Sequence, residues 1–328
     1  MQDHLLDVQD LQTHLFTREG LIKAVDGVSF YLRPGETMGL VGESGSGKTM
    51  TALSIIRLVP SPPGKIVGGK VILDGEDLLS LSNREILQRR STKVSMIFQD
   101  PMTSLDPTMK VGRQVAEPME LHLGLDREEA TRRTVELLDR VGVPAPRKRI
   151  EDYPHQFSGG MRQRVMIAIA LSCTPKLLIA DEPTTALDVT VQAQFLDLVQ
   201  ELQKEMGMAI LWITHDLGVV AELCDRITVM YAGRVVEFGP LEVVLSNPAH
   251  RYTAALLRSI PTMEKRSGRR LEAIRGLPPD LSRVPSGCPF RPRCQYAGPV
   301  CEEVRPSLEQ MAAEHYAACH FPRKEGQQ

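Results

Sequence analysis

The chain has 328 residues, enough for one large domain with a smaller addition, and its 42% apolar and 24% charged residues are ordinary for a globular protein. The formal net charge of −2 provides no global basic field, so we expect no nucleic acid partner. The start, MQDHLLDVQD, lacks the pattern of a secretory signal, and no apolar run approaches the ~18 residues of a membrane span. We therefore expect the chain in the cytosol, where cysteines stay reduced.

Apolar runs alternate with amphipathic stretches over residues 1–246, which predicts an α/β domain. Residues 37–41 are predicted to form a strand that leads into a glycine-rich loop. Helical spacing over about 100–164 predicts a helical insert, and the apolar run 177–180 is typical of a buried parallel strand. Beyond these, the composition of residues 247–328 shifts to proline, arginine and cysteine, which predicts a separate C-terminal extension.

The motif GESGSGKT lies between a predicted strand and a predicted helix and fits the phosphate-binding loop pattern. Its glycines let successive backbone amides point at phosphate oxygens beside a helix N-terminus. Lys48 supplies a cation to the β- and γ-phosphates, and the Thr49 hydroxyl can ligate Mg²⁺. A chance glycine turn is the alternative, and the flanking elements disfavour it. The predicted nucleotide contacts are Gly42, Glu43, Ser44, Gly45, Ser46, Gly47, Lys48 and Thr49.

The stretch LLIADE predicts that a buried strand delivers Asp181 and Glu182 to the carboxyl edge of the sheet, where α/β folds bind ligands. Asp181 would hold Mg²⁺ through water, and Glu182 would orient or deprotonate the attacking water. An acidic pair after a strand is, taken alone, more often a helix cap or a solvated carboxylate. The phosphate loop upstream favours the catalytic interpretation.

Further motifs make the chain resemble the ABC ATPase family. The sequence FSGGMRQ, residues 157–163, resembles the family signature and stands in its usual place before LLIADE, although Met161 replaces the commoner glutamine. In MIFQDP, Gln99 resembles the Q-loop glutamine, and in WITHD, His215 resembles the switch histidine. Ala186, Leu187 and Asp188 resemble the D-loop. Phe16 matches, by position alone, an aromatic that stacks on adenine. Five motifs in the family order exclude coincidence.

This resemblance implies an α/β fold with a phosphate-loop NTPase core of ABC type, an antiparallel β subdomain, a helical insert and a small Cys-rich C-terminal extension. It also implies that two such domains face each other and hold each ATP between one phosphate loop and the partner's signature. Ser158, Gly159, Gly160 and Gln163 would contact the partner's ATP, and Asp188 would act in the D-loop. Glu182, His215 and Gln99 would be catalytic, with Mg²⁺ bound through Thr49, Gln99 and Asp181. A lone histidine after a strand is more often structural, so the role of His215 depends on the resemblance.

Longer stretches resemble the dipeptide and oligopeptide importer ATPases: MIFQDPMTSLDP, HDLGVVAELCDRITVMYAGRVVEFG, RYTAALLRSIP and GCPFRPRC. The chain looks most like the D-type subunit, which pairs with a related F-type ATPase beneath two integral-membrane permease subunits fed by an extracytoplasmic solute-binding protein. This implies ATP-driven peptide uptake at the cytoplasmic face of the membrane, with the residues after Gln99 receiving a permease coupling helix.

Several alternatives stay open at this point. Related importers carry nickel or oligosaccharides. A soluble, non-transport ABC ATPase of repair or translation would carry a long coiled coil or two cassettes, and the chain has neither. A phosphate-loop switch or kinase would have no use for the SGG signature.

Four cysteines cluster in the extension, at Cys288, Cys294, Cys301 and Cys319. Their spacings are wider than the tight pairs of structural zinc sites, so the residues alone indicate only four thiolates able to bind a metal. Disulfides are the alternative, which a cytosolic location disfavours. The family resemblance implies a [4Fe–4S] cluster with a structural role, its negative charge offset by Arg291 and Arg293. A zinc site that recruits His315 or His320 is the alternative.

Overall fold

The computed structural model describes residues 4–100, 104–185, 187–259 and 274–323. They form two compact units, each assembled from several stretches of the chain. The described residues of unit 1 come from Met1–Leu5, Arg33–Gly35 and Ser80–Trp212, and those of unit 2 from Leu6–Leu32, Glu36–Leu79 and Ile213–Gln328.

Parallel strands form the centre of unit 1. Strand β6 (Val94–Ile97) pairs in parallel with β7 (Leu177–Asp181), so that Val94 lies opposite Leu177 and Ile97 opposite Ala180. Strand β8 (Ala209–Thr214) follows on the other side of β7, and its last two residues belong to unit 2. Every residue of β7 is buried, as expected for a continuous apolar run in a parallel sheet. The carboxyl ends of β6 and β7 therefore meet at one edge.

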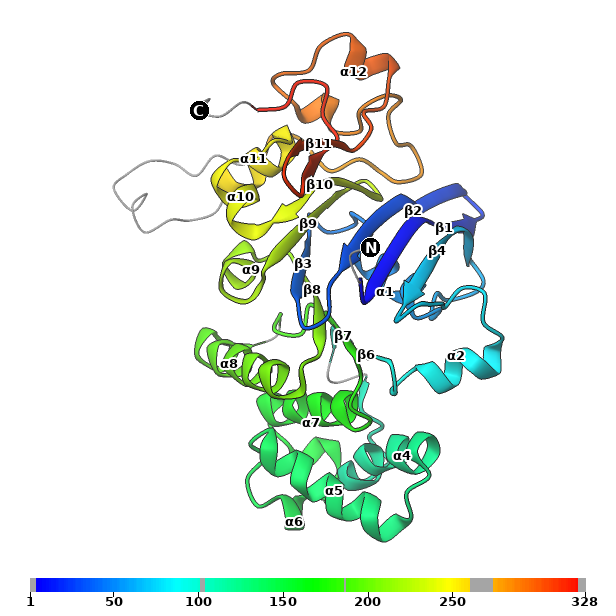
Figure 1. Ribbon diagram of the computed structural model, residues 1–328, viewed down its shortest axis with the longest axis vertical. Coiled ribbons are helices and arrows are strands. Elements are labelled where there is room, and N and C mark those ends of the chain that lie inside the picture. The colour runs from blue at the N-terminus through cyan, green and yellow to red at the C-terminus, as the bar shows by residue number, and fades with distance from the viewer. Residues whose placement is uncertain (1–3, 101–103, 186, 260–273, 324–328) are drawn as a thin grey trace. The chain divides into compact units, whose positions relative to one another are not determined.

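In unit 1, helices α4, α5, α6 and α7 pack on one another as a bundle (Figure 1). Capping residues set several of their starts: Ser82 forms a capping box with Glu85, and Asp126 accepts the amide of Glu129. The helices are α2 (Asn83–Arg89), α4 (Val111–Leu123), α5 (Arg127–Arg140), α6 (Pro146–Arg149), a 3₁₀ turn (Pro154–Gln156), α7 (Gly159–Leu171) and α8 (Val189–Met206).

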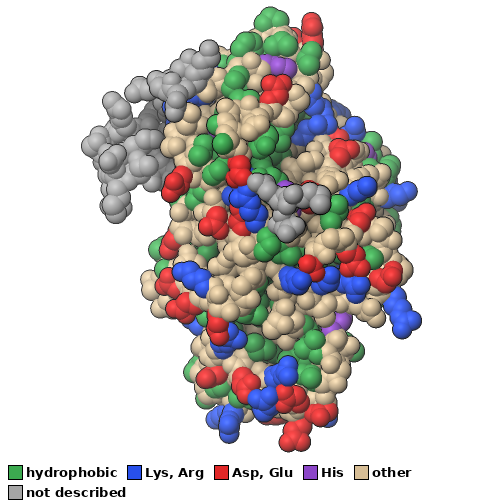
Figure 2. Space-filling view, viewed as in Figure 1, with side chains coloured by type: hydrophobic (Ala, Val, Ile, Leu, Met, Phe, Trp, Pro, Cys, Tyr) green, Lys and Arg blue, Asp and Glu red, His purple; other side chains and the backbone are tan. Residues whose placement is uncertain are grey.

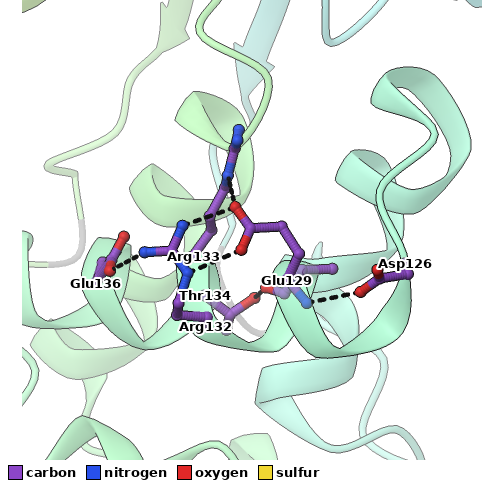
Figure 3. A network of polar contacts seen from close by, with 7 residues as sticks. Asp126, Glu129, Arg132, Arg133, Thr134 and Glu136 are labelled. Atoms are coloured by element: carbon purple, nitrogen blue, oxygen red, sulfur yellow. Dashed lines mark hydrogen bonds and ion pairs between the residues drawn. The ribbon is translucent and has the colours of Figure 1, made fainter.

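Helix α5 carries a network of ion pairs on its exposed side (Figure 3). Glu129 accepts from Arg132 at 2.7 Å and from Arg133 at 2.8 Å, and these bonds lower the pKa of Glu129 to about 2. Exposed pairs at this spacing contribute little to stability, on the order of 0.5 kcal/mol each. Acidic and basic side chains are likewise intermixed over the face drawn in Figure 2.

Unit 2 holds an antiparallel sheet in the order β2-β1-β4-β5. Its central strand β1 buries Leu6, Val8 and Leu11, and a register shift after Val8 coincides with Asp10 at a positive φ of 45°. The strands are β1 (Leu6–Thr17), β2 (Gly20–Leu32), β4 (Gly64–Leu73) and β5 (Glu76–Asp77).

A second group of strands in unit 2 runs in the order β11-β12-β10-β9-β3. Strand β3 (Thr37–Val41) pairs in parallel with β9 (Arg226–Tyr231), which forms an antiparallel pair with β10 (Arg234–Pro240). The C-terminal segment adds β12 (His315–Ala317) to β10 and β11 (Glu309–Ala312) to β12, as Figure 1 shows. The helices are α1 (Lys48–Ile55), α9 (Leu217–Leu223), α10 (Leu241–Ser246), α11 (Arg251–Arg258), a 3₁₀ turn (Arg291–Arg293) and α12 (Val300–Glu303).

A buried carboxylate joins the C-terminal segment to strand β10. Glu237 is fully buried and accepts the amides of Ala249 at 2.6 Å and His250 at 2.9 Å. His315 of β12 contacts the same carboxylate through Nε2 at 2.7 Å. Because a buried carboxylate is costly unless its oxygens are satisfied, these contacts fix β12 against β10. Among the described residues, none of the helices has both the length and the apolar character to cross a membrane.

Candidate nucleotide-binding and catalytic site

The phosphate loop of unit 2 connects β3 to α1, in the strand–loop–helix context that the motif requires. Gly45 and Gly47 have φ of 77° and 102°, a region that favours glycine. A Cβ on Gly47 would lie 2.3 Å from the carbonyl oxygen of Ala24, so the backbone approaches too closely for any side chain. The loop thus has the tight curl that turns backbone amides toward an anion.

Two side chains of this loop show a fit to phosphate. Lys48 is buried and its Nζ donates to the carbonyls of Gly42 at 2.8 Å and Glu43 at 3.2 Å, which places a cation inside the curl. The buried Ser46 hydroxyl has no hydrogen-bond partner among the residues that the structure describes. Because an orphaned buried hydroxyl is costly, a ligand oxygen at this point would satisfy it. Ser44, Gly45 and Thr49 are exposed, so a ligand can reach the loop from solvent.

Sequence reasoning missed the contacts that hold Glu43, the second residue of the loop. Its carboxylate accepts two hydrogen bonds from Arg293, at 2.5 and 2.9 Å, and its amide donates to the Tyr252 hydroxyl at 2.9 Å. Arg293 and Tyr252 lie more than 200 positions along the chain from Glu43. The one sequence feature that could have indicated this contact is the Glu43 carboxylate itself, because a negative charge within an anion-binding loop requires a cation nearby.

In unit 1, the parallel pair β6 and β7 brings Gln99 and Glu182 together at its carboxyl edge. Gln99 Nε2 donates to Glu182 Oε2 at 3.2 Å, and the Thr185 hydroxyl contacts the same oxygen at 3.2 Å. Asp181, the last residue of β7, is only 2% exposed. An amide, a buried carboxylate and a half-buried carboxylate at one sheet edge form a set able to bind a cation and orient a water.

Glu182 has a φ of 45°, which is unusual for a residue with a side chain. Such conformations cost on the order of 1 kcal/mol or more and concentrate at functional sites. The backbone leaves the extended conformation at Glu182, directly after Asp181, the last residue of β7.

The signature residues begin helix α7 at an exposed turn. Ser158 caps the helix by accepting the amide of Met161 at 3.3 Å, and both Ser158 and Gly159 are exposed. No atom lies within 4 Å of where a Gly159 Cβ would be. An uncovered helix N-terminus of this kind presents amides and a hydroxyl to an anion from another molecule.

Gln163, predicted beside these residues as a contact to the partner's ATP, lies elsewhere. It is 4% exposed, and its Nε2 donates to the carbonyl of Pro183 at 2.9 Å. The structure thus places Gln163 inside unit 1, because one turn of helix rotates it away from the exposed face. Asp188 is exposed and caps α8 by accepting the amides of Thr190 and Val191. Ala186 of the D-loop lies outside the described residues.

Two further predicted residues belong to unit 2. His215 follows β8 and is exposed. Phe16, near the end of β1, is 56% exposed, which is unusual for an aromatic ring and leaves its face open to stack on a planar ligand.

The four cysteines of the extension are free thiols, with Cys288 and Cys301 buried and Cys294 and Cys319 half-buried. Burial raises the pKa of Cys288 to about 11 and also raises that of Cys294 and Cys319, and neighbouring thiols of the group add to each shift. In the part of the chain that the structure describes, no group of three or more His, Cys, Asp or Glu side chains could hold a metal ion. The predicted metal centre is therefore not seen in these described residues, and the cluster stays a prediction.

The side chains predicted to assist that centre are engaged elsewhere. His315 contacts buried Glu237, and His320 Nε2 lies 2.8 Å from the carbonyl of Val304. Arg293 is paired with Glu43, and Arg291 donates to the carbonyls of Ser286 and Glu302. The predicted offset of cluster charge by these two arginines is thus wrong as to their partners, because carboxylate and carbonyl oxygens lie closer to them.

Solved structures place the fold among ATP-binding cassettes. The dimeric structure of a post-hydrolysis state of the ATP-binding cassette MJ0796, bound to ADP and Pi, matches with a TM-score of 0.65 at 28% identity, over 72% of this chain and 98% of that chain. The structure of cbiO1 from Clostridium perfringens, part of an ABC transporter complex, matches with a TM-score of 0.63 at 29% identity, over 74% and 90%. The predicted α/β phosphate-loop core of ABC type is confirmed.

The sequence comparisons identify the family to which the chain belongs within the ABC-type ATPases. Residues 25–185 match the ABC transporter family, and residues 236–301 match the oligopeptide/dipeptide transporter C-terminal region. The oligopeptide transport ATP-binding protein OppD of Bacillus subtilis is 50% identical over 95% of this chain and 87% of its own length. OppD of Salmonella typhimurium is 50% identical over 98% and 95%. The chain belongs to the family of ATP-binding subunits of peptide ABC transporters.

Proposed function

We propose that this protein is the ATP-hydrolysing subunit of an importer and powers the uptake of dipeptides or oligopeptides. The observation that carries the proposal is the curled phosphate loop, with Lys48 folded inside it and the Ser46 hydroxyl left unsatisfied. Residues 236–301 match the oligopeptide/dipeptide transporter C-terminal region, and this match supports a peptide as the solute. Nickel and oligosaccharide import remain the alternatives, as does, with less support, a non-transport ABC ATPase.

The predicted residues of the nucleotide site have the following roles in this proposal. The loop from Gly42 to Thr49 binds the ATP phosphates, and Phe16 stacks on adenine. Thr49, Gln99 and Asp181 would hold Mg²⁺, which would supply charge neutralisation at the transferred phosphate. Glu182 orients or deprotonates the attacking water, and His215 senses the γ-phosphate.

A second ATPase subunit, related to this chain and of F type, completes the ATP sites in the proposed assembly. The exposed turn at Ser158, Gly159 and Gly160 supports this, because one chain has one such turn and it is uncovered. A matched cassette is also dimeric in its ADP-bound structure. Asp188 lies at the seam through the D-loop in this arrangement.

The remaining partners are two integral-membrane permease subunits and an extracytoplasmic solute-binding protein, with this chain peripheral at the cytoplasmic face. The helical bundle of unit 1 offers a place for a permease coupling helix, since α4 and α5 line a cavity of about 130 Å³. Its lining combines the small residues Gly112 and Ala116 with charged side chains, Lys110, Arg113, Glu120, Arg127 and Glu151.

A separate proposal concerns the four cysteines, which we propose hold an iron–sulfur cluster. What supports it is that the thiols lie close enough for charge on one to disfavour charge on another. An iron–sulfur cluster is larger than a single zinc ion and can therefore join thiolates that lie further apart. The four ligands of a zinc ion, each at ~2.3 Å from the metal, must lie almost in contact with one another. Cluster binding would displace the protons that burial now favours.

The importer proposal is tested by purifying the tagged full chain from membranes of its own cell and identifying what accompanies it. Permease-like integral-membrane proteins are expected, whereas ribosomes or DNA would indicate a non-transport ATPase. Growth of a deletion strain on a panel of peptides as sole amino-acid source then tests the solute. Loss of nickel or oligosaccharide uptake with normal growth on every peptide would contradict the peptide assignment.

A further inference from the structure

Two side chains of the C-terminal extension contact Glu43 of the phosphate loop: the Tyr252 hydroxyl at its backbone amide and Arg293 at its carboxylate. Arg293, in the 3₁₀ turn directly before Cys294, donates from Nη1 to Glu43 Oε2 at 2.5 Å and from Nη2 to Glu43 Oε1 at 2.9 Å. The Arg293 side chain is 5% exposed and that of Glu43 is 24% exposed. Two parallel hydrogen bonds between a guanidinium and a carboxylate fix both distance and orientation, which an exposed pair of long side chains does not.

Arg293 is itself held in place on other sides. Its Nε donates to the carbonyl of Arg275 at 2.9 Å, and its Nη1 also lies 3.3 Å from the Tyr231 hydroxyl at the end of β9. These two contacts hold the Arg293 guanidinium in place independently of Glu43, as the role of a positioning residue requires.

Glu43 is held at its backbone as well as its carboxylate. Its amide donates to the Tyr252 hydroxyl, and its carbonyl accepts the amide of Ser46 at 3.2 Å, within the curl. The carbonyl of Ser46 accepts the amide of Gly233 at 2.9 Å. The two ends of the curl are thus tied to different parts of unit 2, and the end nearest the extension is tied through Arg293.

This arrangement bears on ATP affinity in two ways. A loop with three glycines loses much conformational freedom when it closes on phosphates, and holding it beforehand reduces that cost. A carboxylate in the loop would also repel the phosphates unless a cation neutralises it. Arg293 both holds the phosphate loop in place and supplies the positive charge that neutralises the Glu43 carboxylate.

We propose that Arg293 is a positioning residue for the phosphate loop, through which the C-terminal extension raises the affinity for ATP. The inference depends on the proposed role of Gly42 to Thr49 as the ATP site. Arg291 provides a matched control, because it lies in the same 3₁₀ turn and, among the described residues, its side chain donates to carbonyls of the extension.

The test measures the Kd for ATP of the full chain by titration calorimetry in wild type, Arg293→Met, Arg291→Met, Glu43→Gln and Arg293→Met/Glu43→Gln. Arg293→Met should weaken ATP binding roughly tenfold, the order expected when a charge-assisted pair is lost, and Arg291→Met should not. With Glu43→Gln present, the added Arg293→Met should cost much less, because no unneutralised carboxylate remains. If Arg293 merely anchors the extension, Arg293→Met should weaken ATP binding by the same factor in the wild-type and in the Glu43→Gln background. That result would overturn the proposal.

Lys48→Ala separates failure of this inference from failure of the ATP site. Wild-type affinity in Lys48→Ala would mean that the loop is not the site. Loss of binding in Lys48→Ala with wild-type affinity in Arg293→Met would overturn this inference alone. Should Arg293→Met not fold, Arg293→Lys decides, since it keeps the charge but loses the fork. It should weaken binding measurably, and unchanged affinity would count against the proposal.

Discussion

Gln99 donates to the Glu182 carboxylate at 3.2 Å across the carboxyl edge of β6 and β7. The two residues are 83 positions apart, and the parallel pairing of their strands is what brings them together. The bond leaves the Gln99 carbonyl for a cation and keeps the Glu182 carboxylate directed toward the same place. Under the proposed function, this bond links the residue that orients the attacking water to a ligand for Mg²⁺.

Lys48→Ala should nearly abolish ATP binding by the full chain. The side chain is the cation inside the curl, and its removal leaves the phosphates with backbone amides alone. Equilibrium titration with a fluorescent ATP analogue measures the effect, with exposed Lys65→Ala as control. Affinity equal to that of the control would refute the role of Lys48.

Gly159→Asp should leave the fold intact and stop ATP hydrolysis by the assembled transporter. The site has open space for a side chain, and a carboxylate in the first turn of a helix is mildly stabilising, by about 0.5 kcal/mol. The same charge would repel the partner's γ-phosphate. Gly159→Asn, of equal size and neutral, should retain most activity. Equal loss in both variants would point to steric disturbance and against an anion at this turn.

His250 should make stability fall as the pH drops. Burial lowers its pKa to about 4, against an ordinary value near 6.5, so between these values the unfolded chain binds a proton that the folded chain does not. The contribution is fully present above pH 6.5 and is lost as the pH falls toward 4, up to about 3 kcal/mol.

Urea unfolding of the full chain between pH 4.5 and 7.5 measures this dependence. His250→Asn keeps an acceptor for the Tyr252 amide that caps α11 but does not titrate, so it should flatten the curve. Exposed His155→Asn should leave the slope unchanged. An unaltered slope in His250→Asn would contradict the assignment.

Anaerobically purified protein should contain iron and acid-labile sulfide, and Cys288→Ser should lose both. Cys288 is buried beside the other thiols of the group, whereas Cys173, buried in unit 1, provides a control in Cys173→Ser. Metal analysis and visible absorption are the measurements. Zinc without iron in the wild type, or no metal at all, would reject the cluster.

The sequence predicts best what is local. The strand at 37–41 and the helix predicted after the glycine loop coincide with β3 and α1, because an apolar run, a glycine loop and a helix N-terminus are encoded by neighbouring residues. The run 177–180 falls within β7 for the same reason. Motif order then identifies Gln99 and Glu182 as candidates before the strand pairing is known.

What the sequence could not predict are contacts between distant segments. Nothing near Arg293 indicates that Glu43, 250 positions away, is its partner, and the neighbouring cysteines suggested a different one. His315 was likewise a candidate metal ligand until β12 placed it on Glu237. Helical rotation also determines which residues of a motif face outward, and it places Gln163, a predicted contact to the partner's ATP, on a buried face of α7.

Glu182→Gln tests the central claim, that ATP is cleaved at this site, most directly. The variant keeps the size of the side chain and removes the carboxylate that orients or deprotonates water. In the purified transporter it should bind ATP with affinity near that of wild type and hydrolyse it at least about a hundredfold more slowly in a single turnover. Exposed Glu201→Gln on α8 is the control. Hydrolysis by Glu182→Gln at the control's rate would contradict the account.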